Sequence, residues 1–230
     1  MINISKWGRL CLMTLAALTC NAASSAEALI FDNPFFVAIR AGDNVYGYYY
    51  SKDERFSCLF MFSGVNQLKN IDNRSPAQIR IETYSPNLHQ ASFAYTDRDK
   101  LFDVSGDLFV SSEKWVIRTE KPQGACNGIG ADFGKSPDDP AATRFTVEKK
   151  IEVVGIGIAN RKTFFYRQPG AEIEKRFLLR GDIALIISKR GDFAHVRFAN
   201  PNLVSSTRDP VITGWIRSAD LKNPLPPLAH

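Results

Sequence analysis

Residues that perform most enzyme chemistry are scarce in this chain of 230 residues, which has only 3 His and 4 Cys. The sequence contains no Gly-x-Ser-x-Gly motif, no Cys-x-x-Cys pair, no His-x-x-His pair and no acidic calcium loop. Hydrolases need a nucleophile, a base and an oxyanion site, and metal sites need clustered ligands. His89 lies in a turn-like segment, and His195 should lie on the outer face of a strand. The sequence therefore predicts no catalytic residue, no metal site and no cofactor.

No apolar run approaches the roughly twenty residues that a membrane-spanning helix needs. Residues 10–19 form a run of about ten apolar residues that follows the basic residues Lys6 and Arg9, and small residues lead to Ala26, a pattern typical of a secretory signal. We predict a signal peptide over residues 1–26, a mature chain that begins at Glu27, a periplasmic or secreted location and no stable membrane insertion after cleavage. A lipoprotein remains an alternative, because residues 17–20 loosely resemble a lipobox.

The sequence has no strong excess of positive charge. Lys and Arg number 29 against 24 Asp and Glu, a formal charge of +5. Without Lys6 and Arg9 the count falls to 27 against 24, or +3, in the predicted mature chain. Binding to nucleic acid phosphates needs basic residues clustered on one face. The balance of charge therefore predicts no nucleic-acid partner.

Removal of the predicted signal would leave two of the four cysteines, Cys58 and Cys126. An even pair in an oxidising compartment is most simply a disulfide. The alternative is a reactive thiol, but neither residue belongs to a Cys-x-x-Cys motif. We predict a structural Cys58–Cys126 bridge.

The pattern from residue 27 to residue 134 has the period of β-strands. Phe56, Cys58 and Phe60 alternate with Ser57 and Leu59, as in a strand with one face buried. Similar short runs occupy residues 45–50, 78–83, 90–95, 107–110 and 114–119. Clusters of Gly, Pro, Asn and Asp separate these runs and supply turns. We predict an all-β chain whose first domain, residues 27–134, is antiparallel and braced by the disulfide.

A change of composition follows the first domain. Residues 135–147 include two prolines among small and acidic residues, which is typical of a linker. Short strand-like runs then recur from residue 148 to residue 223 with glycine turns at the spacing of a small barrel. The proline-rich residues 224–230 are predicted to be a flexible tail.

Motifs of the second module resemble those of a known family. They are the aromatic run Thr163 to Tyr166, the turn Phe177 to Asp182, the hairpin Gly191 to Val196 and the closing segment Gly214 to Arg217. In order and spacing they resemble the bacterial Src homology 3-like domains of exported proteins, over about a third of the chain. The resemblance implies a small five-stranded β-barrel whose groove binds peptides or glycan-linked peptides without catalysis.

Two aromatic runs, residues 46–50 and 164–166, cannot bury every ring on one face of a strand. One face of each run must be covered by the other module or a partner, or be exposed. The predicted binding residues are Phe164, Tyr166, Phe193 and Trp215. Packing between modules, or within the barrel core, is the alternative for these rings.

These observations favour a non-catalytic periplasmic binding protein that recognises a peptide or protein at the cell envelope, with a toxin or peptidoglycan among the candidate partners. A specific form of this hypothesis is an immunity protein, or an inhibitor of a toxin or wall hydrolase. The alternative is a cell-wall hydrolase that uses carboxylates in one turn-rich segment: Asp97, Asp99, Asp103 and Asp107. A purely structural role in an envelope complex is not separated from the first hypothesis by the sequence.

Overall fold

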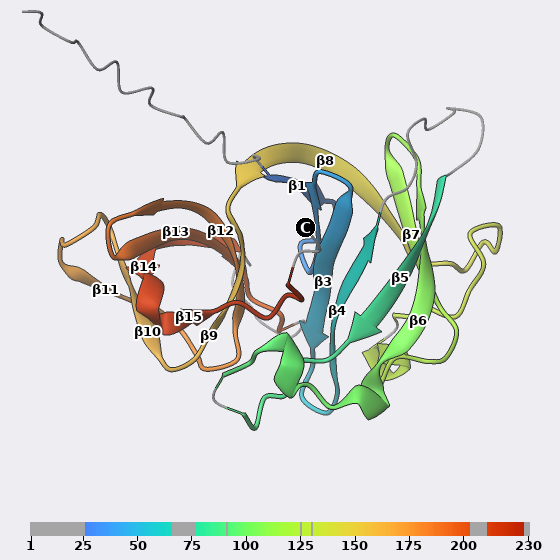
Figure 1. Ribbon diagram of the computed structural model, residues 1–230, viewed down its shortest axis with the longest axis horizontal. Helices are drawn as coiled ribbons and strands as arrows, with labels where there is room; N and C mark the ends of the chain where they lie inside the picture. Colours follow the sequence, from blue (N-terminus) through green and yellow to red (C-terminus); the bar gives the residue numbers. More distant parts are fainter. Residues whose placement is uncertain are drawn as a thin grey trace, which may run out of the picture.

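The computed structural model describes residues 26–65, 77–90, 92–124, 126–129, 131–202 and 211–227 (Figure 1). The protein is all-β, with 56% of residues in strands and 7% in helical turns. The predicted signal peptide lies outside these residues except for Ala26, which begins the first strand. In the described part of the chain, no helix has the length and apolar character needed to span a bilayer.

The first unit is a closed antiparallel barrel in which each strand pairs with the next along the chain (Figure 1). The eighth strand pairs with both the seventh and the first, which closes the barrel. The strands are β1 (Ala26–Phe31), β2 (Phe36–Ala41), β3 (Asn44–Lys52), β4 (Ser57–Val65), β5 (Ala77–Tyr84), β6 (Val104–Val110), β7 (Lys114–Thr119) and β8 (Arg144–Val153). Short 3₁₀ turns lie between them: η1 (Tyr95–Asp97), η2 (Lys100–Phe102) and η3 (Cys126–Ile129).

Aromatic rings fill the barrel interior. Phe36 stacks on Phe145 with ring centroids 4.0 Å apart, and Phe60 meets Phe133 edge to face at 5.0 Å. Offset and edge-to-face pairs of this kind suit the ring quadrupoles. Gly47 faces this core, where a Cβ atom would lie 2.0 Å from the Val37 carbonyl oxygen. The backbone of β2 and the Phe62 ring can lie this close to β3 because Gly47 has no side chain.

The disulfide between Cys58 and Cys126 is confirmed. It joins β4 to η3 with a Cα–Cα distance of 4.5 Å, and both residues are buried in the barrel core. The bridge thus ties the loop after β7 to the start of β4.

The second unit is an open seven-stranded sheet that curves into a half-barrel (Figure 1). Its order is β11-β10-β14-β13-β12-β9-β15. The strands are β9 (Gly155–Ala159), β10 (Thr163–Tyr166), β11 (Ile173–Leu178), β12 (Ile183–Arg190), β13 (Phe193–Ala199), β14 (Val211–Arg217) and β15 (Leu221–Lys222), with η4 (Ser218–Asp220) before the last. The concave face encloses a core that includes Phe165, Val196 and Ile216. This sheet differs in strand number from the five-stranded barrel that the family resemblance implies.

The boundary between the units lies later in the chain than the composition suggests. Residues 144–147, predicted as linker, begin β8, and residues 148–153, predicted as the second module, complete it in the first barrel. The chain changes unit at Val154 and Gly155, and Gly155 adopts φ 153°, which favours glycine. β8 closes the barrel by pairing with β7 through residues 144–146 and with β1 through residues 147–153, so the end of the predicted linker belongs to the first unit.

The two units pack through one buried cluster. The outer face of β1 to β4 contributes Tyr46, Tyr48 and Met61, while β9 and β12 contribute Ile158 and Leu185. Tyr49, which lies between Tyr48 and Tyr50, points instead into the barrel core. The tyrosine run therefore serves both faces of β3, and its outward rings are covered by the second sheet.

Candidate binding surface

The predicted binding residues lie on the convex face of the second sheet. Phe165 and Ile216 point into the half-barrel core, so strand alternation turns their neighbours outward. Tyr166 is paired directly with Trp215 across β10 and β14. Phe193 lies on β13, whose register with β14 brings it beside these rings. Three of the four predicted residues thus come from three adjacent strands and share one face.

The rings on this face contact one another. The Tyr166 and Phe193 rings meet edge to face with centroids 5.1 Å apart. The imidazole of His195 stacks on the Trp215 indole at 5.0 Å. His195 and Trp215 are direct cross-strand partners, a position at which aromatic pairs stabilise a sheet.

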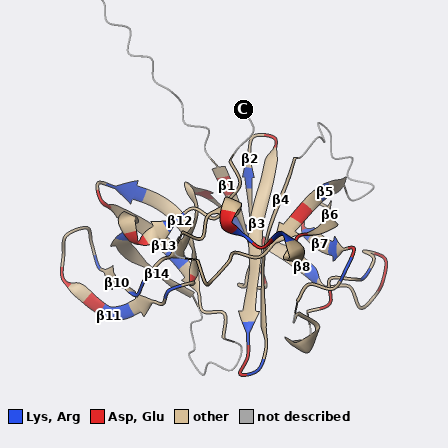
Figure 2. Cartoon of the chain, turned by 60° about the horizontal axis from the view of Figure 1, so that its bottom comes forward, with Lys and Arg blue, Asp and Glu red and all other residues tan. Residues whose placement is uncertain are grey.

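Arginine side chains lie over two of these rings. The guanidinium of Arg190 is 5.5 Å from the Trp215 ring centroid, and that of Arg217 is 5.6 Å from the Phe193 centroid. Arg217 Nε also donates to the Tyr166 hydroxyl at 3.4 Å, and this contact raises the pKa of Arg217. Basic residues end β12 and recur on β11 (Figure 2). The surface therefore combines apolar rings with fixed positive charge.

The fourth predicted residue begins a second aromatic group on the same face. Phe164 pairs with Phe177 of β11, and their rings are 5.9 Å apart. The ammonium of Lys162 lies 4.1 Å from the Phe177 centroid and 5.1 Å from that of Phe164. Phe164 is 37% exposed and Phe177 39% exposed, so both rings are open to solvent. We call these two groups together the aromatic face: Phe164, Tyr166, Phe177, Phe193, His195 and Trp215, with the cations Lys162, Arg190 and Arg217.

A buried arginine marks the border between the aromatic face and the barrel. Arg197 continues the outward side of β13 but is only 8% exposed, and its Nη1 has no hydrogen-bond partner among the described residues. Burial lowers the pKa of Arg197, and burial raises the pKa of the nearby Tyr48 to about 12. On one side of Arg197 the convex face of the sheet packs against the barrel. On the other side the same face is open to solvent and forms the aromatic face.

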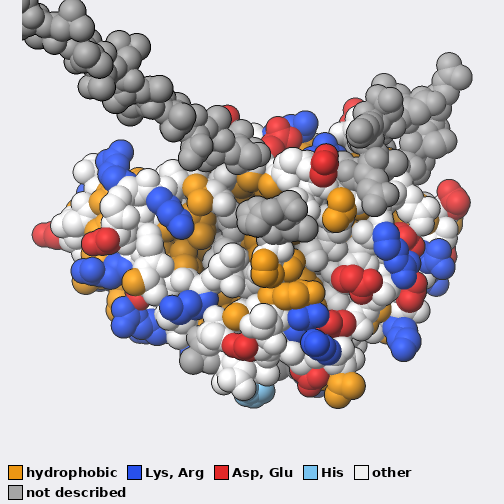
Figure 3. All heavy atoms as spheres, in the orientation of Figure 1, with side chains coloured by type: hydrophobic (Ala, Val, Ile, Leu, Met, Phe, Trp, Pro, Cys, Tyr) orange, Lys and Arg blue, Asp and Glu red, His pale blue; other side chains and the backbone are white. Residues whose placement is uncertain are grey.

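The sequence predicts that His195 points outward but assigns it no role in binding. Phe177 and the three cations are not among the predicted binding residues. Alternation could have identified Phe177, because it lies on a short strand opposite the predicted aromatic run. The contacts of Arg190 and Arg217 depend on pairing between strands that are distant in the sequence, which no local pattern reports. The space-filling view shows basic groups beside hydrophobic side chains over the second unit (Figure 3).

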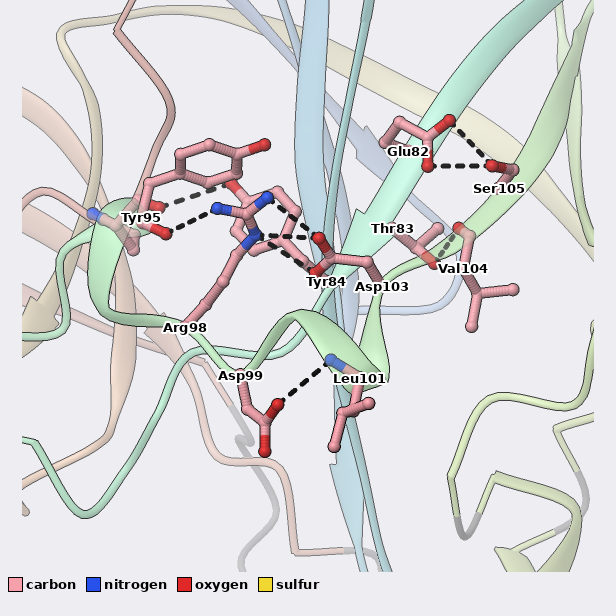
Figure 4. A network of polar contacts seen from close by, with 11 residues as sticks. Glu82, Thr83, Tyr84, Tyr95, Arg98, Asp99, Leu101, Asp103, Val104 and Ser105 are labelled. Atoms are coloured by element: carbon pink, nitrogen blue, oxygen red, sulfur yellow. Dashed lines mark hydrogen bonds and ion pairs between the residues drawn. The ribbon is translucent and has the colours of Figure 1, made fainter.

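The carboxylates of the alternative hypothesis each have a structural partner. Asp103 accepts hydrogen bonds from Arg98 at both carboxylate oxygens, with a closest distance of 2.8 Å (Figure 4). Asp99 accepts from the Leu101 amide at 3.0 Å and caps η2. Asp97 accepts from Ser92, and Asp107 lies 3.7 Å from Arg80. These contacts hold the segment between β5 and β6 in place.

Within the described residues, no group of three or more His, Cys, Asp or Glu side chains gathers in the manner of metal ligands. Comparison of the chain with protein-family models, with curated proteins and with solved structures found no match.

Proposed function

We propose that this protein is a non-catalytic binding protein of the cell envelope and that its aromatic face holds a peptide or protein partner. The observation that carries the proposal is the aromatic face itself. Two of its rings are exposed and the other four are half-buried, on the convex side of a sheet whose concave side packs a core of its own. Tyr, Trp and Arg are the residues most enriched at protein interfaces.

The cations narrow the class of partner. Lys162, Arg190 and Arg217 lie over rings, where they present positive charge beside apolar surface. A partner with carboxylates next to apolar or aromatic side chains would complement both properties. An acidic segment of a protein, or a peptide with free carboxyl groups such as those of peptidoglycan, has this chemistry.

Side-chain recognition suits this surface better than addition of a strand at the sheet edge. The edge strand β11 is short, its pairing with β10 is irregular, and Glu174, Lys175 and Arg176 follow one another along it. Charged residues and irregular pairing are the features that discourage edge-to-edge association of strands. The convex face beside this edge is therefore the favoured contact.

Three further observations support the envelope setting. The confirmed disulfide is expected to persist in an oxidising compartment. The N-terminal pattern of a secretory signal and the resemblance of the second module to Src homology 3-like domains point to the same setting. An immunity protein or an inhibitor of a secreted toxin or wall hydrolase is the specific form of the function that we favour.

Affinity capture tests the proposal. Immobilised wild-type protein is exposed to an envelope extract and, separately, to purified muropeptides, and retained material is identified by mass spectrometry. We expect Trp215→Ala and Tyr166→Ala to lose the retained partner, and higher salt to weaken retention because the cations contribute. Phe56→Ala is the matched control, since Phe56 is an exposed ring on the barrel (43%).

Retention of the same material by Trp215→Ala and wild type would overturn the role of the aromatic face. Digestion of cell wall by the purified protein, lost in Asp97→Asn or Asp107→Asn, would overturn the non-catalytic assignment in favour of a hydrolase.

A further inference from the structure

The proline-rich C-terminal segment lies in a groove between the two units. After β15 the chain leaves the second sheet and crosses to the barrel (Figure 1). Pro224 is buried, and its carbonyl oxygen accepts a hydrogen bond from the Tyr84 hydroxyl at 3.3 Å. Leu225 packs against the buried cluster that joins the units. Residues 224–227, predicted as part of a flexible tail, are therefore docked on the protein.

The tyrosine that holds this segment is fixed by its surroundings. Tyr84 meets Tyr95 edge to face at 4.8 Å, and the Arg98 guanidinium lies 3.6 Å from the Tyr95 centroid and 5.8 Å from that of Tyr84 (Figure 4). Asp103 in turn fixes Arg98 through an ion pair of 2.8 Å. Burial raises the pKa of Tyr84, so its hydroxyl keeps its proton at any physiological pH. Tyr84 is thus a preorganised donor for a carbonyl group.

Unfilled space lies on both sides of the docked segment. Leu225, Pro226 and Pro227 line a cavity of about 320 Å³ toward the second sheet and another of about 300 Å³ toward β3, β4 and β5. Tyr46 borders both cavities. The space-filling view shows hydrophobic side chains gathered at the centre of the molecule, where the segment crosses between the units (Figure 3). The segment therefore lies between two cavities, and apolar side chains form part of the wall of each.

The first cavity also contains an unused polar group. Ser218 lines it, and the Ser218 hydroxyl is buried with no hydrogen-bond partner among the described residues. A buried hydroxyl without a partner carries a free-energy cost that an incoming carbonyl or amide would remove. Ile156, Ile186 and Leu221 supply apolar wall around it.

We propose that this groove is a binding site for an extended, apolar, proline-containing peptide, and that residues 223–227 of the chain occupy it as an internal ligand. Proline has no amide donor, so a polyproline-type segment offers only carbonyl acceptors and apolar ring faces. The groove offers the matching partners, the Tyr84 hydroxyl and apolar walls. A partner segment of the same chemistry would compete with the internal one. This site is separate from the aromatic face and does not depend on its function.

A peptide-binding measurement on the full chain tests the proposal. Leu225→Asp places a charge in the apolar groove and should release the internal segment. A fluorescein-labelled peptide with the sequence of residues 221–227 is then titrated with each protein, and anisotropy is recorded. We expect Leu225→Asp to bind this peptide about tenfold more tightly than wild type or more, because the wild-type segment competes intramolecularly at a high effective concentration.

The controls separate release of the segment from general damage. Leu101→Asp changes a leucine that is 89% exposed and lies outside the groove, and it should bind the peptide as weakly as wild type. Leu225→Ala removes the packing without introducing charge and should give an intermediate affinity. Tyr84→Phe added to Leu225→Asp should weaken binding severalfold, since the carbonyl loses its donor.

Three results would overturn the proposal. The first is absence of binding by both Leu225 variants when near-ultraviolet circular dichroism shows them folded. The second is equal affinity of wild type, Leu101→Asp and Leu225→Asp. The third is a wild-type dimer that Leu225→Asp converts to a monomer, because a second copy would then be the donor of the docked segment.

Discussion

Asp182 is a carboxylate in an unfavourable environment. It lies between β11 and β12, is buried, and accepts a hydrogen bond from the Leu179 amide at 2.7 Å. Burial raises the pKa of Asp182, while the Leu179 amide and then Lys52 oppose the shift. The folded protein therefore retains this proton to higher pH than the unfolded chain does. Its contribution to stability is complete below the ordinary pKa and is lost as pH rises through the raised value.

Asp182→Asn should remove this pH dependence, because the Asn amide oxygen can still accept from Leu179 while no charge is buried. We expect the variant to be more stable than wild type near pH 7, with the difference disappearing near pH 3. Urea unfolding of both proteins at the two pH values gives the comparison. A constant difference between the two proteins across this range would contradict the assigned environment of Asp182.

At the scale of single elements, the disulfide joins β4 to η3 by a covalent bond. Cys58 and Cys126 are 68 residues apart in sequence, and closing a loop of that length in the unfolded chain stabilises the fold by at most about 4 to 5 kcal/mol. We expect Cys58→Ser combined with Cys126→Ser to lower the free energy of unfolding by up to that amount, as measured by urea titration. Wild type in reductant should approach the same stability, and an unchanged midpoint in the double variant would contradict the prediction.

Alternation within strands could be predicted from the sequence, but pairing between strands could not. The outward direction of Phe164 and Tyr166 follows from their positions on either side of Phe165, so the core of the candidate site was predictable. Arg217 reaches Phe193 only because β14 pairs with β13 in one particular register. That register depends on the whole sheet, and local periodicity carries no information about it.

Local periodicity also could not place the boundary between the two units correctly. Residues 151–158 have the apolar pattern of one continuous strand, yet they end β8 in the barrel and begin β9 in the second sheet. The apolar residues at the end of β8 and the isoleucines of β9 pack in the cluster that joins the units, so the apolar pattern continues across the boundary. Which sheet each strand joins depends on the closure of the barrel, a property of the complete chain. The all-β class was predictable because alternation along each strand is a local pattern. The disulfide was predictable because only two cysteines follow the predicted signal.

At the scale of the whole molecule, the buried cluster between the units should make them unfold together. A chain that begins at Ala26 contains two of the three tryptophans, Trp115 in the barrel core and Trp215 on the aromatic face. Trp115→Phe and Trp215→Phe leave one fluorescent reporter in each unit. We expect the two reporters to give coincident urea transitions, as in a two-state protein. A separate, earlier transition for Trp215 would show that the second sheet unfolds alone.

Leu185→Ala tests whether the interface is the cause of this coupling. Leu185 is fully buried between the sheet and the barrel, so its truncation should cost about 2 to 5 kcal/mol. We expect the loss to appear equally in the Trp115 and Trp215 signals, since neither unit can keep its outer face covered once the other has unfolded. Leu101→Ala, at a leucine that is 89% exposed, should leave both midpoints unchanged. A shift confined to the Trp215 signal would mean that the barrel is stable without the second sheet.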